Sequence, residues 1–95
     1  MKLNEQKERS VMSNMDHQQE LLTILMEECA EVIRECSKIQ RFGLTPERNM
    51  LELEIGDLMC MIKLLTENKI IDTEKVYEAS AKKREKLKKW SNLNV

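Results

Sequence analysis

Four acidic residues stand in two pairs whose types and spacing suit metal chemistry. Glu28 and Glu31 are three residues apart, and so are Glu54 and Asp57. Residues three apart on an α-helix share a face, so each pair would present two carboxylates side by side. Carboxylate oxygens suit hard cations, whereas zinc sites are usually built with nitrogen and sulfur ligands. Because the one histidine, His17, is a helix-length from either pair, we expect Mg²⁺ or Mn²⁺ rather than zinc or a di-iron centre.

The second pair falls among residues that should form the core. On a helical wheel Glu54 lies between Met61 and Leu65, and Asp57 is in the same apolar sector. A carboxylate removed from water is unfavourable unless it is protonated, paired or bound to a cation. If the two helices pack antiparallel, four carboxylates converge, and a divalent cation would relieve their repulsion. The alternative is that these acids form plain salt bridges with Lys38 or with lysines near the C-terminus.

The first pair lies at the border of an apolar helix face. Glu28, Glu31 and Glu35 fall at the edge of this arc, and Glu27 lies further toward solvent. Lys38 follows Glu31 by seven residues and is on the same side of the wheel. It could line the site and bind substrate, or it could pair with an acid.

Three helical segments would position these groups. The apolar periodicity predicts helices over residues 16–40, 46–67 and 73–90, the second beginning at Pro46 or Glu47. Asp16 is expected to cap the first helix, with Gly43 closing it, and Asp72 or Thr73 to cap the third. Residues 41–48 hold the only proline and one of the two glycines, so they form the main loop. Because short connections make sequential helices antiparallel neighbours, we expect an all-α bundle of antiparallel helices.

The length of the chain, 95 residues, allows one small domain. Residues 1–14 are polar and fit an arm or a short helix, and residues 15–95 are expected to form a single helical domain. A chain this short buries little surface by itself. The bundle is therefore expected to be completed by oligomerisation.

The cysteines and the apolar runs bear on the cellular setting. Cys29, Cys36 and Cys60 are odd in number and lie in apolar helical patterns, which predicts reduced, buried thiols. The polar start of the chain has no signal-peptide core, and no apolar run approaches the ~20 residues of a membrane span. We expect a cytoplasmic protein that does not enter the membrane.

The net charge of −1 conceals two opposed regions. The first 80 residues carry −6, whereas residues 81–90 carry +5, with six Lys or Arg against one acid. Such a segment could be a solvated helix end whose lysines offset the helix dipole. A nucleic-acid surface is disfavoured, because Trp90 is the only aromatic residue among the basic ones.

The acidic pairs belong to a longer pattern. Glu27-Glu28-Cys29-Ala30-Glu31 is followed, after 22 residues, by Glu54-Ile55-Gly56-Asp57. This EExxE…ExxD pattern resembles the all-α nucleoside triphosphate pyrophosphohydrolases of the MazG type. Their superfamily also includes dimeric dUTPases, dCTP pyrophosphatases and phosphoribosyl-ATP pyrophosphohydrolases. The likeness runs from LLTILMEECAEVIRECSKIQRFG through LELEIGDLMCMIKLL to KKREKLKKW, about three quarters of the chain.

The resemblance implies hydrolysis of the α–β phosphoanhydride of a nucleotide to a monophosphate and pyrophosphate. The Mg²⁺ ligands it implies are Glu28, Glu31, Glu54 and Asp57. Glu27 matches a more variable leading acid and takes a supporting catalytic role, while Glu28 or Glu31 could accept the proton of the attacking water. The residues it implies for polyphosphate contact are Lys83, Arg84 and Lys86. A homodimer or homotetramer, whose pocket borrows residues from a neighbour, would suit this chemistry.

Two other functions stay open at this point. Phosphoribosyl-ATP hydrolysis shares the acidic pattern, so only its substrate would distinguish it. A non-catalytic helical interaction module, in which the acids form salt bridges with the C-terminal lysines, would need neither metal nor nucleotide.

Overall fold

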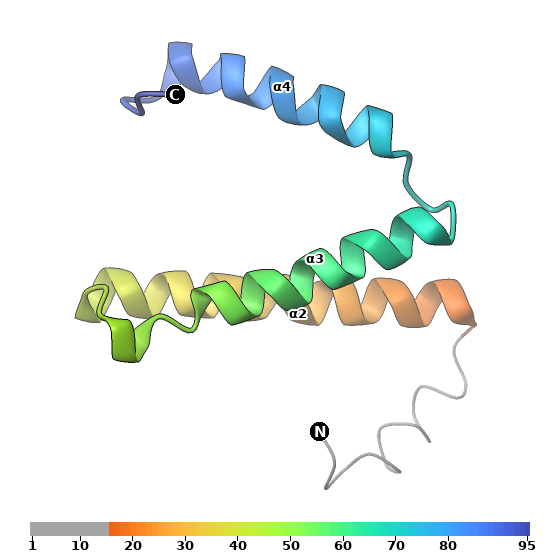
Figure 1. Ribbon diagram of the computed structural model, residues 1–95, viewed down its shortest axis with the longest axis horizontal. Coiled ribbons are helices and arrows are strands. Elements are labelled where there is room, and N and C mark those ends of the chain that lie inside the picture. The colour runs from red at the N-terminus through yellow and green to blue at the C-terminus, as the bar shows by residue number, and fades with distance from the viewer. Residues whose placement is uncertain (1–15) are drawn as a thin grey trace, which may run out of the picture. The chain divides into compact units, whose positions relative to one another are not determined.

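The computed structural model describes residues 16–95, which form helices joined by short connections (Figure 1). In chain order the elements are α2 (His17–Phe42), the 3-10 turn η2 (Pro46–Arg48), α3 (Leu51–Glu67) and α4 (Thr73–Trp90). No strand occurs among these described residues, which confirms the all-α prediction. The arm or short helix predicted for residues 1–14 lies outside them.

The start of α2 has the predicted cap. The Gln19 backbone N–H donates to Asp16 Oδ1 at 2.7 Å, and the Asp16 N–H donates to Gln19 Oε1 at 3.0 Å. This reciprocal capping box satisfies two amides that a helix end leaves unpaired. The helix ends two residues later than predicted, where Gly43 adopts a φ of 86° and donates to the Ile39 carbonyl at 2.8 Å. A left-handed φ of this kind favours glycine.

The start of the second predicted helix is wrong by several residues. Pro46 opens the separate turn η2, and α3 begins only at Leu51. Between them Asn49 has a ψ of 69°, which is not helical, and its Nδ2 donates to Glu52 Oε1 at 2.9 Å. The non-helical backbone of Asn49 separates η2 from α3, and the bond between the two side chains spans this junction.

The connection from α3 to α4 closes one helix and caps the next. The Ile70 N–H donates to the Leu65 carbonyl at 2.9 Å and the Lys69 N–H to the Thr66 carbonyl at 3.0 Å. These two bonds form a Schellman motif, with Lys69 at a φ of 59° in the position that glycine usually takes. Asp72 then caps α4 by accepting from the Glu74 N–H at 2.9 Å, which confirms the predicted start.

The chain divides into two compact units, residues 16–64 and residues 65–95 of the described part, and each is considered by itself. In the first unit α2 and α3 lie alongside each other and run in opposite directions (Figure 1). Its most buried apolar side chains are Leu21 and Met61, each 6% exposed. This small core is what two helices can form by themselves.

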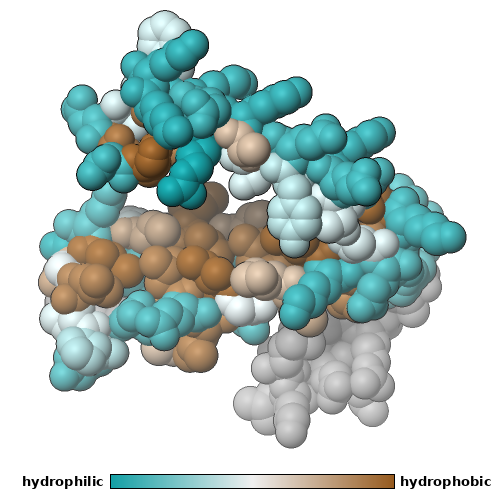
Figure 2. Space-filling view, turned by 45° about the horizontal axis from the view of Figure 1, so that its top comes forward, coloured by the Kyte–Doolittle hydropathy of each residue, from teal (hydrophilic) through white to brown (hydrophobic). Residues whose placement is uncertain are grey.

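A second row of apolar residues along α2 is left uncovered in this unit. We call it the α2 seam, and its members follow one another at spacings of four and three: Leu22, Met26, Cys29, Ile33 and Cys36. Apolar surface gathers over the two-helix unit (Figure 2). The prediction of buried thiols is wrong for the single chain, because Cys29, Cys36 and Cys60 are all exposed. The wheel placed them on apolar arcs, but α2 and α3 cover only part of each other.

The second unit consists of the end of α3, the connection and α4. Helix α4 buries none of its residues within this unit. Among residues 16–95 no helix combines the length and apolar character that a bilayer crossing requires.

Candidate metal centre

Three acids from two helices come together in the first unit. Glu28 of α2 and Glu54 and Asp57 of α3 each offer a carboxylate oxygen, and these oxygens lie within 4.8 Å of one another. Oxygens around Mg²⁺ stand about 3 to 4 Å apart, because each lies about 2 Å from the ion. Small side-chain rotations would bring the three acids to that spacing. We call Glu28, Glu54 and Asp57 the acidic triad.

Burial and mutual repulsion both act on the triad. Glu28 and Glu54 are half-buried, and Asp57 is exposed. The pKa of Glu28 is raised, first by burial and then by the charges of Asp57, Glu54, Glu27 and Glu31. The pKa of Glu54 is raised by burial, then by Glu31, Asp57 and Glu35, while Arg34 lowers it. A divalent cation would oppose these shifts, because it favours the ionised carboxylates.

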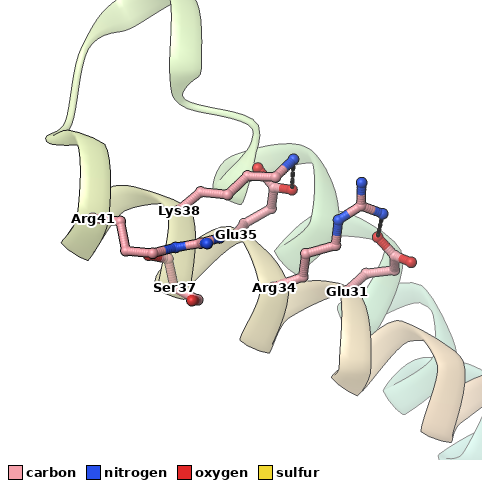
Figure 3. Close-up of polar contacts among 6 residues, drawn as sticks. All are labelled: Glu31, Arg34, Glu35, Ser37, Lys38 and Arg41. Carbon is pink, nitrogen blue, oxygen red and sulfur yellow. Dashed lines mark hydrogen bonds and ion pairs between the residues drawn. The ribbon is translucent and has the colours of Figure 1, made fainter.

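The ion pairs described in this unit do not include the triad. Among the side chains described in residues 16–64, none of the ion pairs joins Glu28, Glu54 or Asp57 to a lysine or arginine, although the charge of Arg34 lowers the pKa of Glu54. The pairs that do occur there lie along α2, between Arg34 and Glu31 and between Lys38 and Glu35 (Figure 3). Among the side chains described in this unit, the triad therefore has no ion-pair partner.

Glu31 lies beside the triad rather than within it. Its carboxylate is 3.7 Å from the Arg34 guanidinium (Figure 3), yet its charge is the first of those that raise the pKa of Glu54. The structure thus brings three of the four predicted ligands together and leaves the fourth next to Glu54. The role of Glu31 as a ligand stays a prediction.

Glu27 lies on the solvent side of α2, where the helical wheel put it. It is exposed, and its charge contributes to the raised pKa of Glu28. It is thus close enough to influence Glu28 but is outside the triad. Its supporting role stays a prediction.

Glu35 is the residue whose importance the sequence did not reveal. It is 5% exposed, and its Oε2 accepts a hydrogen bond from Lys38 Nζ at 3.2 Å. The wheel placed it with Glu28 and Glu31 at the edge of the apolar arc, and nothing in the pattern indicated that it is buried. The available signal was its spacing, since Glu28, Glu31 and Glu35 form one row at intervals of three and four.

The basic residues of α4 belong to the second unit. Lys83, Arg84 and Lys86 are exposed there, and the ion pair of that helix joins the neighbouring Lys88 and Glu85 at 2.9 Å. The structure does not place them relative to the triad, so contact with a polyphosphate stays a prediction. A hollow of about 810 Å³ also lies in this unit, where α3 turns into α4, and Asp72 is the one acid that lines it.

One comparison with known proteins identifies a family. A family model described as MazG nucleotide pyrophosphohydrolase domain matches residues 16–91, which include both acidic pairs and the basic segment. No curated protein and no solved structure matches the chain.

Proposed function

Because the chain belongs to the MazG nucleotide pyrophosphohydrolase family, we propose that it hydrolyses the α–β phosphoanhydride of nucleoside triphosphates. The products are a nucleoside or deoxynucleoside monophosphate and pyrophosphate, and the cofactor is Mg²⁺, for which Mn²⁺ can substitute. The acidic triad of Glu28, Glu54 and Asp57 is the observation that supports this proposal most directly. Its three oxygen ligands and the lack of a nearby histidine fit a hard cation.

In this proposal the acidic residues of α2 and α3 have two roles, which are to hold the ion and to accept a proton. The triad and Glu31 would hold Mg²⁺, and the ion would supply charge neutralisation for the phosphate oxygens as water attacks. Glu28 or Glu31 accepts the proton of that water, and Glu27 supports the base from the solvent side.

A panel of dNTPs and NTPs with Mg²⁺, scored for pyrophosphate and monophosphate, tests the proposal. We expect equal amounts of the two products and no activity when EDTA removes the metal. Release of inorganic phosphate would point to cleavage at a different bond. A chain that hydrolyses only phosphoribosyl-ATP would carry out the second enzymatic function considered above.

Thermal melting separates the enzyme from a non-catalytic module. A protein that binds Mg²⁺ and nucleotide is stabilised by them, with the logarithm of the ligand concentration once this exceeds the dissociation constant. An interaction module built on salt bridges would show no such rise in melting temperature. The triad supports the enzyme, because three acids that come together from two helices suit a divalent cation.

The basic segment of α4 is proposed to bind the polyphosphate. Arginine can grip a phosphate with two hydrogen bonds, and lysine provides a point charge. We expect Lys83→Ala and Arg84→Ala to raise KM, lower kcat or do both in the pyrophosphate assay, and Lys86 to contribute in the same way. Unchanged kinetics would instead identify this segment as a solvated helix end.

Assembly belongs to the same proposal. The α2 seam is an apolar stripe at four-three spacing, the pattern by which helices pack against other helices. We propose that a second copy of the chain covers it, in a homodimer or in a homotetramer of two dimers. The antiparallel bundle is then completed between copies.

A further inference from the structure

We infer that Glu35 is a positioning residue, whose buried carboxylate holds the Lys38 ammonium beside the acidic triad so that Lys38 can bind a phosphate oxygen of the nucleotide. The inference rests on the proposed function, since it assigns two residues to the binding of that substrate. Figure 3 shows the two side chains directed toward one another from successive turns of α2.

The burial of Glu35 separates this pair from ordinary surface ion pairs. Its side chain is 6% exposed, whereas the acids of two further pairs in the described helices, Glu31 with Arg34 and Glu85 with Lys88, are 42% and 69% exposed. Each of these pairs joins residues three apart on one helix. Exposed pairs of this kind contribute little to stability, and a buried acid is unfavourable unless a cation compensates it. Stability alone therefore does not explain why Glu35 is an acid.

Lys38 is arranged to serve both Glu35 and a ligand. Its Nζ is 3.2 Å from Glu35 Oε2, yet its side chain is 41% exposed. An ammonium group has three N–H donors, so the bond to Glu35 leaves donors for a second anionic partner. Without Glu35 the long side chain would be free to adopt many rotamers, and a phosphate would have to order it at an entropic cost.

The direction of the side chains places this ammonium toward the acidic residues. Side chains on an α-helix lean toward its N-terminus, so Lys38 reaches back along the row formed by Glu35, Glu31 and Glu28. The Cα atoms of Lys38 and Glu31 are about 10 Å apart along the axis, because each residue adds 1.5 Å. A polyphosphate bound at the triad and extending toward the C-terminal end of α2 would meet the ammonium within that interval.

Glu35 also keeps the lysine away from the metal ligands. A free ammonium close to several carboxylates would be attracted to them and would compete with a divalent cation. The charge of Glu35 contributes, after those of Glu31 and Asp57, to the raised pKa of Glu54, so Glu35 acts electrostatically on one member of the triad. By retaining Lys38, Glu35 leaves the triad available for the ion.

The test compares Glu35→Gln, Lys38→Ala and the double variant, with Glu52→Gln as a control. Glutamine keeps the size of Glu35 and removes its charge, and Glu52 is an exposed acid of the same unit. We expect each single variant to raise KM for a dNTP by about tenfold, near the contribution of one charge-assisted hydrogen bond, with kcat within about twofold. The double variant should be no worse than Lys38→Ala, Lys38→Arg should retain most of the affinity, and the control should match the wild type.

Three results would overturn the inference. Effects of Glu35→Gln and Lys38→Ala that multiply in the double variant would mean that the two residues act separately. A higher Mg²⁺ requirement in Glu35→Gln that persists in the double variant, where no lysine is left to compete with the ion, would make Glu35 a metal ligand. An unchanged KM in Glu35→Gln, with melting temperature as the check on folding, would leave the pair a purely structural one.

Binding of a non-hydrolysable α,β-imido nucleotide with Mg²⁺, measured by calorimetry, separates this inference from the proposed function. If the wild type binds the analogue without hydrolysing dNTPs, and both variants weaken binding equally, the inference stands and the proposed reaction is wrong. If it hydrolyses dNTPs and Glu35→Gln changes neither KM nor analogue affinity, only the inference is wrong. A wild type that neither binds nor hydrolyses a nucleotide would overturn both.

Discussion

At the scale of single residues, three carboxylates are held close together although each repels the others. This arrangement is unfavourable in the metal-free protein and useful when a divalent cation binds. We expect Glu54→Gln and Asp57→Asn to lower pyrophosphate release by at least about 100-fold, as loss of one charge-stabilising group commonly does. Both variants should melt at a higher temperature than the metal-free wild type, because the repulsion with Glu28 is relieved.

Glu52→Gln is the matched control for these two variants. It removes one acid from the same helix, but Glu52 is exposed and its carboxylate pairs with Asn49. It should keep activity near the wild-type level. Full turnover in Glu54→Gln or Asp57→Asn would contradict the assignment of the triad to the metal.

The raised pKa values of Glu28 and Glu54 predict how stability depends on pH. A carboxyl whose pKa is higher in the folded than in the unfolded state favours folding below the unfolded value, here 4.5, and this contribution is lost as pH rises through the folded pKa. Mg²⁺ binds the ionised forms. The rise in melting temperature caused by Mg²⁺ should therefore be larger at pH 7 than near pH 5. A rise of equal size at both values would argue against the triad as the binding site.

Residue types and spacing predicted the triad because the helical repeat puts residues three or four apart on the same face of a helix. Glu28, Glu54 and Asp57 needed only that rule and an antiparallel pair of helices. The position of Glu31 depends on Arg34, a long side chain whose rotamer the pattern does not specify. The burial of Glu35 depends on how α2 and α3 pack against each other. A helical wheel describes one helix at a time and does not show this packing.

At the scale of elements, the helix ends could be predicted where a capping side chain or a glycine marks them in the sequence. Asp16, Gly43 and Asp72 mark their boundaries through hydrogen bonds or a φ that their residue types favour. The exception was the start of α3, because Pro46 can open either an α-helix or a 3-10 turn. The structure has the 3-10 turn, which ends at Asn49 with a ψ of 69°, and the residue types do not specify this backbone angle.

Lys69 offers a prediction about one of these ends. It adopts a φ of 59° in the Schellman motif that terminates α3, and a residue with a Cβ is disfavoured there by roughly 1 kcal/mol relative to glycine. Lys69→Gly should raise the free energy of unfolding by up to about that amount, measured by urea denaturation at one protein concentration. Lys69→Ala removes the charge but keeps the Cβ, so it should give no such gain. Equal effects of the two substitutions would attribute the change to charge rather than backbone conformation.

At the scale of the whole molecule, the exposed α2 seam raises the question of whether the functional unit is one chain or an oligomer. Ile33 is 70% exposed and Met26 65% exposed, and Cys29 and Cys36 lie on the same row. The thiols were predicted to be buried, but they are exposed in the single chain. A second copy packed on the α2 seam would bury them. Light scattering should therefore find a dimer or tetramer. Ile33→Lys should shift it toward monomer, because a lysine in the centre of an apolar interface is desolvated without a partner.

The cysteines provide an independent readout of the same assembly. In the oligomer Cys29 and Cys36 should react slowly with a thiol reagent, because the partner helix shields them, and Ile33→Lys should make them react at the rate of exposed thiols. Ile33→Leu preserves the apolar contact and should leave both assembly and thiol reactivity as in the wild type. A wild-type chain that stays monomeric, with all three thiols reacting rapidly, would show that the seam is open to solvent. The triad would then have to bind metal and nucleotide from one chain alone, with only α2 and α3 to shield the reaction from water.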